Sequence, residues 1–100
     1  MNVDFIDFTD LKLVEKSLKA TTKLIWIETP SNPTMKIIDI EAIVKIVRKV
    51  KGKDCWILAD NTFATPYLQS PLLMGCDMVR YHVSASLVYT YTFLKKLKKI

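Results

Sequence analysis

Apolar residues recur at the spacing of an α-helix in two stretches of the chain. In residues 10–19 they fall three and four positions apart, and either Thr9 or Asp10 is available as the N-cap. A second stretch, between Asp39 as the cap and Gly52 as the stop, has a broader apolar face. The apolar positions of these two predicted helices are Leu11, Val14 and Leu18, then Ile40, Ile43, Val44 and Val47.

Three other apolar runs lack that spacing and are rich in strand-forming residues. Residues 23–29, 55–60 and 78–83 are therefore predicted strands. Continuous apolar runs of this length are typical of strands that are covered on both faces in a parallel sheet. Residues 70–77 predict a further short helix. Strands that alternate with helices indicate an α/β fold. The chain has 100 residues, of which 50% are hydrophobic, and this suits one domain or part of one.

Polar loops follow the first two predicted strands. The segment "ETPSNP" begins at Glu28, and "DNTF" begins at Asp60. Ligands of such sheets bind outside the carboxyl ends of the strands, so the two loops form a candidate ligand edge. An aspartate after a strand more often caps a turn, and from the local pattern alone Asp60 fits either role.

The charge of the chain is concentrated at its C-terminal end. The net charge is +5, and the last acidic residue along the chain is Asp77. The basic residues beyond it are Arg80, Lys95, Lys96, Lys98 and Lys99. The preceding residues are therefore neutral in sum, and the excess belongs to a basic tail.

The cysteines and the first residues both favour a cytoplasmic protein. Cys55 and Cys76 form no CxxC pair and the chain has one histidine, so we expect two buried thiols and no metal site. The opening "MNVDFIDFTD" contains aspartates and no basic residue, unlike a secretory or mitochondrial leader. The longest uncharged stretch, Tyr81–Leu94, is too short and too polar to predict a membrane span.

Several motifs, in order, resemble a known enzyme family. "LIWIETPSNPT", then "DI", then "ADNTFATPYLQSPLLMGCDMV" are similar to the central part of the pyridoxal-phosphate-dependent enzymes of cysteine and methionine metabolism, nearest to the cystathionine gamma-lyases. The resemblance runs from about Val3 to about Val79. It implies an α/β fold, as a partial parallel-sheet slab of a fold-type I (aspartate-aminotransferase-like) large domain. Residues 1–79 would be a fragment of the cofactor-binding domain, and residues 80–100 a divergent basic tail.

The resemblance also implies an activity and a cofactor. The family's members are carbon–sulfur lyases of transsulfuration and cysteine biosynthesis, which act on small sulfur amino acids with pyridoxal 5'-phosphate (PLP). Asp60 matches the carboxylate that the family pairs with the ring nitrogen of PLP, Asn32 the asparagine beside the ring, and Ser84 a hydroxyl within reach of the phosphate. Thr62 would shape the turn after Asp60. The implied core residues are Trp26, Ile27, Ile57 and Leu58.

One element of the family's site has no counterpart in this chain. The family follows "GCDMV" with a Ser-Ala-Thr-Lys-like segment, whose lysine forms a Schiff base with the cofactor. That position falls on Ala85 or on Leu87, depending on the alignment, and neither side chain forms an imine. We therefore expect no catalytic residue, a catalytically incompetent and poorly stable chain, and a truncated or mis-spliced origin.

The alternative function is a non-catalytic interaction. Four lysines and an apolar face in "YTFLKKLKKI" are typical of an amphipathic helix that binds a partner groove or, less favoured, an anionic membrane. Family members are oligomers, so a homo-oligomer or a full-length family subunit is another candidate partner. We expect no nucleic-acid binding, because no reading motif accompanies the charge. The apolar face of the predicted tail helix is Phe93, Leu94, Leu97 and Ile100.

Overall fold

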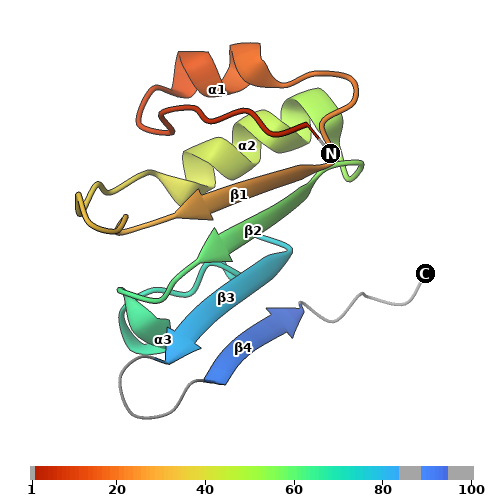
Figure 1. Cartoon of the computed structure of the whole chain (residues 1–100). Helices are drawn as coiled ribbons and strands as arrows, with labels where there is room; N and C mark the ends of the chain where they lie inside the picture. The colour runs from red at the N-terminus through yellow and green to blue at the C-terminus, as the bar shows by residue number, and fades with distance from the viewer. Residues whose placement is uncertain (1, 84–88, 95–100) are drawn as a thin grey trace.

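The structure, a computed structural model, describes residues 2–83 and 89–94. Its elements along the chain are α1 (Leu11–Ser17), β1 (Leu24–Glu28), α2 (Ile40–Lys51), β2 (Trp56–Asp60), α3 (Thr65–Leu68), β3 (Met78–Val83) and β4 (Tyr89–Leu94). Figure 1 shows α1 and α2 side by side next to β1, whereas α3 lies at the end toward which β1, β2 and β3 point.

The four strands form one sheet in the order β1-β2-β3-β4. β1 pairs with β2 and β2 with β3 in parallel, whereas β3 and β4 are antiparallel. The predicted α/β fold with a parallel sheet is thus confirmed for the first three strands. β3 runs without interruption through residues 79 and 80, where the sequence analysis divides the chain, and that division stays a prediction.

The two longer helices begin at predicted caps. The carboxylate of Asp10 accepts hydrogen bonds from the backbone N–H groups of Lys12 and Leu13, at 2.9 and 3.1 Å. Asp39 accepts one from Ala42 at 2.9 Å. These bonds satisfy N–H groups that have no partner within the first turn of a helix. α2 ends at Gly52, whose φ of 57° is a conformation that glycine adopts without strain.

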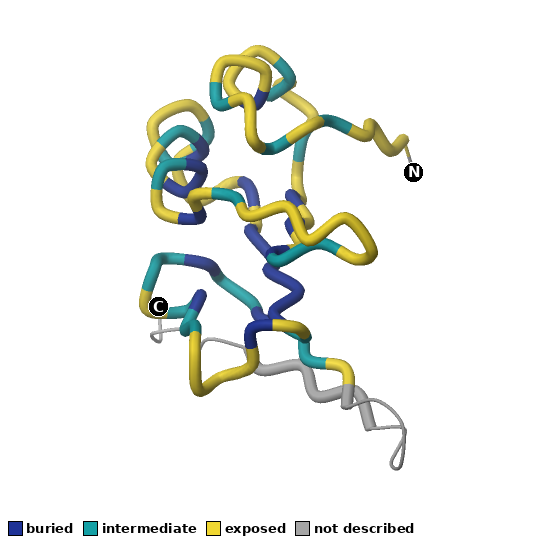
Figure 2. The backbone as a smooth tube through the Cα atoms, turned by 90° about the vertical axis from the view of Figure 1, so that its left-hand side faces the viewer, coloured by how far each residue is buried: buried dark blue, intermediate teal, exposed yellow. Residues whose placement is uncertain are grey.

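The core lies between the two helices and one face of β1 and β2. Figure 2 shows the buried residues gathered where the helices face the strands, with exposed residues along the outer turns. The two cysteines are buried free thiols in this part of the molecule, as the sequence predicts. The helices contribute Val14, Ile40, Ile43, Val44 and Val47 to the core, and the strands contribute Ile25, Ile27, Ile57 and Ala59.

The opposite face of the sheet carries apolar side chains that remain accessible. Leu24, Trp26 and Trp56 are 46%, 52% and 39% exposed. The expectation that Trp26 is a core residue was therefore wrong: side chains alternate along a strand, and its neighbours in β1 take the inward positions. The other expected core residues, Ile27, Ile57 and Leu58, are buried.

Two local predictions were wrong. Residues 71–75 form turns instead of the expected helix, and the helix of this region is the preceding α3, with Pro66 in its first turn. Phe93 and Leu94 belong to strand β4 and not to a helical face, and the sequence 89–94, "YTYTFL", does alternate with the period of a strand. Leu97 and Ile100 lie outside the described residues. In the part of the chain that the structure describes, no helix is long and apolar enough to cross a membrane.

Candidate functional site

Three charged residues form a row across the parallel strands, at the carboxyl ends of β1 and β2 and within β3. Glu28 of β1 is in register with Asp60 of β2, and Asp60 with Arg80 of β3. Because residues in register on neighbouring strands point to the same face, all three side chains belong to the face opposite the helices. The edge where a ligand is expected therefore carries charged side chains, including an arginine that the sequence analysis did not place there, and its role in ligand binding stays a prediction.

Asp60 is buried and its two carboxylate oxygens have different partners. It is 6% exposed. Oδ1 accepts hydrogen bonds from the backbone N–H of Thr62 at 3.1 Å and from the Thr62 hydroxyl at 2.5 Å. Oδ2 accepts one from Nη1 of Arg80 at 2.6 Å, an ion pair. The Thr62 oxygen in turn accepts from the backbone N–H of His82 at 2.9 Å, so the turn after Asp60 is tied to β3.

The guanidinium of Arg80 is held from two sides. Its Cζ lies 5.7 Å from the centroid of the Trp26 ring, a cation–π distance. Trp26 belongs to β1 and Arg80 to β3, so the arginine side chain extends across β2 to reach it. The Arg80 side chain is 31% exposed and that of Asp60 8%, so the pair is closed on the aspartate side and open to solvent on the arginine side.

Asn61, next to Asp60, is a structural residue and not part of a ligand edge. It is fully buried. Its Nδ2 donates to the carbonyl oxygens of Thr65 and Gln69 at 3.1 and 2.8 Å and to the Tyr81 hydroxyl at 3.3 Å. Its Oδ1 accepts from Nε2 of Gln69 at 2.7 Å, and the same Nε2 donates to the carbonyl of Thr29 at 3.2 Å. These bonds fix the loop around α3 against the strand ends.

Asn32 and Ser84, the other two expected cofactor-binding residues, have no described contact with Asp60. Asn32 is exposed in the loop that follows β1, between two cis X-Pro bonds, Thr29–Pro30 and Asn32–Pro33. Among the described residues, no hydrogen bond joins its side chain to Asp60, although Asn32 follows and Asp60 ends a strand at the same edge of the sheet. Ser84, and with it the expected lysine positions Ala85 and Leu87, lies outside the described residues. The structure therefore joins Asp60 directly to Arg80, and the roles of Asn32 and Ser84 beside a cofactor stay predictions.

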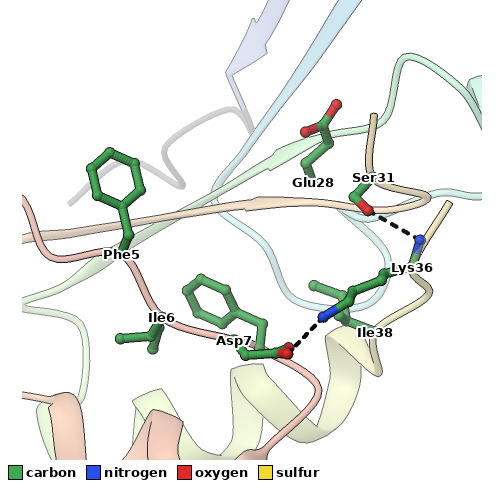
Figure 3. Close-up of a pocket in the computed structure, with 8 residues that line it drawn as sticks. Phe5, Ile6, Asp7, Glu28, Ser31, Lys36 and Ile38 are labelled. Atoms are coloured by element: carbon green, nitrogen blue, oxygen red, sulfur yellow. Dashed lines mark hydrogen bonds and ion pairs between the residues drawn. The ribbon is translucent and has the colours of Figure 1, made fainter. Parts of the chain in front are cut away.

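An open cleft of about 410 Å³ lies beside this edge, between the N-terminal segment and the loop after β1. Figure 3 shows Phe5, Ile6 and Asp7 on one side of it and Glu28 and Ser31 on the other. Nζ of Lys36 donates to Asp7 at 2.7 Å. This bond, with further hydrogen bonds from Thr9, holds the pKa of the Asp7 carboxyl well below its usual range. Asp60 does not line the cleft, which is therefore separate from the charged row apart from Glu28.

PLP, which the resemblance implies, requires that a carboxylate oxygen of Asp60 face its ring nitrogen. Both oxygens are already bonded, and the one that accepts from Arg80 already faces a cation. A protonated ring nitrogen would bring a second positive charge beside the guanidinium, and its N–H would compete with Nη1 of Arg80 for the same oxygen. Asp60 paired with Arg80 therefore does not fit the ring. Among the described residues, no group of three His, Cys, Asp or Glu side chains is arranged to hold a metal ion.

Arg80 is the site residue that sequence reasoning missed. The sequence places it in a strand and in the charge excess, but strand register, which brings it opposite Asp60, is a tertiary property. One signal was available in the chain: an arginine in an otherwise apolar run requires a partner, and a carboxylate at the end of the neighbouring strand is the natural one.

Comparison with known proteins gives the family. The model of the family described as "Cys/Met metabolism PLP-dependent enzyme" matches residues 1–86, and so extends beyond Val79, where the resemblance of the motifs ends. Human cystathionine gamma-lyase is 46% identical over 81 residues, which are 81% of this chain and 20% of that protein. L-methionine gamma-lyase of Fusobacterium nucleatum subsp. polymorphum is 39% identical over 84 residues, 84% of this chain and 21% of that protein.

A solved structure agrees in fold. The crystal structure of cystathionine gamma-lyase from Lactobacillus plantarum complexed with L-serine superposes with a TM-score of 0.70 at 45% sequence identity, over 76% of this chain and 19% of that one. The chain thus spans about a fifth of the length of the relatives it matches. With a family match over most of its residues and a matching fold, the chain belongs to the Cys/Met metabolism PLP-dependent enzyme family.

Proposed function

We propose that this chain is a segment of the cofactor region of a PLP-dependent carbon–sulfur lyase that acts on cystathionine or a related sulfur amino acid, in transsulfuration and cysteine biosynthesis. One observation carries the proposal: Asp60 is a buried carboxylate at the carboxyl end of the middle one of three parallel strands. That is where sheets of this class bind ligands. In the whole enzyme the cofactor would supply an electron sink for the substrate's reacting carbon.

We also propose that these 100 residues do not catalyse the reaction by themselves. The family's imine-forming lysine position falls on Ala85 or Leu87. Asp60, the carboxylate that the family directs at the cofactor, is paired instead with Arg80. Lys95, Lys96, Lys98 and Lys99 are the nearest amines along the chain, and nothing in the sequence matches them to the lysine of the family.

Borohydride reduction in the presence of PLP tests this proposal. The 100-residue chain is incubated with PLP, reduced, and analysed by intact mass and peptide mapping, with L-cystathionine turnover assayed in parallel. We expect partial labelling scattered over surface lysines, the same pattern in chain unfolded by urea, and no turnover. One pyridoxyl-lysine at full occupancy in the folded chain alone, or measurable turnover, would contradict it.

Two further assignments belong to the same proposal. We propose that residues 1–79 are the cofactor-domain fragment and residues 80–100 a divergent basic tail, a division supported by the onset of the charge excess after Asp77. We propose a cytoplasmic location, which is supported by the two cysteines that remain buried free thiols. Removal of residues 95–100 followed by vesicle co-sedimentation tests membrane contact by the tail, and we expect no difference between the two chains.

An interaction with other subunits is the alternative function, and the exposed sheet face favours it. Leu24, Trp26 and Trp56 lie together on the face opposite the helices, and such apolar faces are usually covered by a partner or by further chain. Sedimentation velocity of the chain alone, and mixed with a full-length relative, tests this alternative. The control is Leu73→Ser, at an exposed residue in the turn before β3. A complex that Trp56→Ser removes and Leu73→Ser leaves intact would support the alternative.

A further inference from the structure

The contact between Arg80 and Asp60 is built into the sheet. The two residues are directly in register on neighbouring parallel strands, and their side chains leave the same face. The guanidinium needs no loop movement to reach the carboxylate, and Nη1 lies 2.6 Å from Oδ2. A charged hydrogen bond of this length, to a carboxylate that is nearly inaccessible to water, is among the stronger polar contacts in a protein.

Trp26 fixes the guanidinium in place. Its ring lies 5.7 Å from Cζ of Arg80 and comes from β1, on the far side of β2. Arg80 is thus stretched over the strand that carries Asp60, between the carboxylate and an aromatic face. On the other side Thr62 donates twice to Oδ1, so donors surround the carboxylate in the folded chain.

We propose that Arg80 is an internal counter-ion of Asp60 that excludes a pyridinium ring from this carboxylate. The inference concerns the site of the proposed function and rests on it. The class of ligand excluded is a protonated pyridine, as in PLP and its analogues, because a ring N–H and a guanidinium N–H compete for the same oxygen. Removal of the guanidinium, with the aliphatic stem retained, opens Asp60 to such a ring.

The probe is 4'-deoxypyridoxine 5'-phosphate with a ¹⁵N-labelled ring, which has no aldehyde and forms no imine with any lysine. Its dissociation constant is measured by equilibrium dialysis for the wild type, Arg80→Met, Arg80→Lys and Arg80→Met/Asp60→Asn. The ¹⁵N chemical shift of the bound probe reports whether the ring nitrogen is protonated, and far-UV circular dichroism checks that each variant is folded.

We expect Arg80→Met to bind at least tenfold more tightly than the wild type, with a protonated ring nitrogen. Arg80→Lys keeps the charge and stays close to the wild type, and the added Asp60→Asn removes the gain. Equal affinities of wild type and Arg80→Met, whether both are tight or both immeasurably weak, would overturn the proposal.

A measurement on the wild type alone does not depend on how the variants fold. In a ¹H–¹⁵N titration with the same probe, the indole signal of Trp26 stays in place if Arg80 retains its position. A saturable shift of that signal, with a protonated probe nitrogen, would show that the ring reaches Asp60 and would refute the exclusion. Because the probe forms no imine, these results are independent of the borohydride test of the proposed function.

Discussion

Arg48 of α2 binds Asp77, the residue before β3, through a 2.6 Å contact between Nη2 and Oδ2. The same carboxylate oxygen accepts the backbone N–H of Ile57 at 2.8 Å, and Nη1 of Arg48 donates to the carbonyl of Cys55 at 2.8 Å. One ion pair thus joins the C-terminal part of α2, the first residues of β2 and the entry to β3. This ion pair therefore anchors the amino end of β3, the strand that carries Arg80.

Arg48→Met should destabilise the fold measurably. The two side chains are only 26% and 29% exposed. The substitution removes the charged donor of the Asp77 carboxylate, which keeps the backbone N–H of Ile57, and the Arg48 donor of the Cys55 carbonyl. We expect the free energy of unfolding to fall by about 2 kcal/mol in urea denaturation, since charged hydrogen bonds contribute roughly 1.5–3 kcal/mol.

Lys49→Met on the same helix is the matched control. Its ion pair with Glu15 is 3.2 Å long and largely exposed, and such surface pairs contribute about 0–1 kcal/mol. Equal losses for Arg48→Met and Lys49→Met would mean that the pair with Asp77 has no special structural role.

Gly75→Ala should cost more stability than Gly52→Ala. Both glycines have positive φ, 102° and 57°, but a Cβ at Gly75 would lie 2.8 Å from a methyl group of Val44. A Cβ at Gly52 would meet nothing within 4 Å. We expect roughly 1 kcal/mol for Gly52→Ala from backbone strain, and about 1–3 kcal/mol more for Gly75→Ala from overpacking.

Thermal melts can separate backbone strain from the steric clash with Val44. They compare Gly75→Ala and Gly52→Ala with Val44→Ala and with the Gly75→Ala/Val44→Ala double variant. If the methyl contact is the cause, the double variant should be more stable than the sum of the single effects predicts. Strict additivity would leave only the backbone conformation as the explanation.

Asp7 should make the stability of the N-terminal segment depend on acid pH. The hydrogen bond from Lys36 lowers the pKa of its carboxyl below the ordinary value of 3.8. A carboxyl whose pKa is depressed by folding stabilises the fold fully above its unfolded value, and this contribution is lost as the pH falls toward the folded value. The stability advantage of the wild type over Lys36→Met should therefore be constant above about pH 4 to 5 and shrink below it.

Urea denaturation of both proteins between pH 7 and pH 2 measures this difference. Asp7→Asn should remove the same acid-dependent part, because its amide does not titrate. A wild-type advantage that stays constant down to pH 2 would show that the Asp7–Lys36 contact is not maintained in solution.

Elements whose signals are local were predictable from the sequence, and relations between strands were not. The cap Asp39, the stop at Gly52 and the first cap, as Thr9 or Asp10, could be predicted because capping depends on residues a few positions apart. Trp26 was misplaced because an apolar run does not reveal that one face of its strand lacks a cover. β4 was missed because its charged continuation favoured a helical reading over the alternation of "YTYTFL".

The residues of the candidate site also divide into those that local sequence predicts and those that only tertiary contacts bring together. Asp60 could be predicted because its motif is carried by consecutive residues, and its place at a strand end is confirmed, while its cofactor role stays a prediction. The contact of Asp60 with Arg80 could not be predicted, because the two residues become neighbours only through the register of β2 and β3. The role of Asn61 as a buried hub depends on Gln69 and Tyr81, which no local pattern connects to it.

The strand order β1-β2-β3-β4 has a consequence for how the chain is made. Because the order in space is the order of synthesis, each strand that the structure describes adds to an edge that already exists, and none of these strands must insert between two earlier ones. The sheet therefore grows in one direction as the chain leaves the ribosome. Asp60 gains its counter-ion on the nascent chain only when β3 arrives, because Arg80 belongs to that strand.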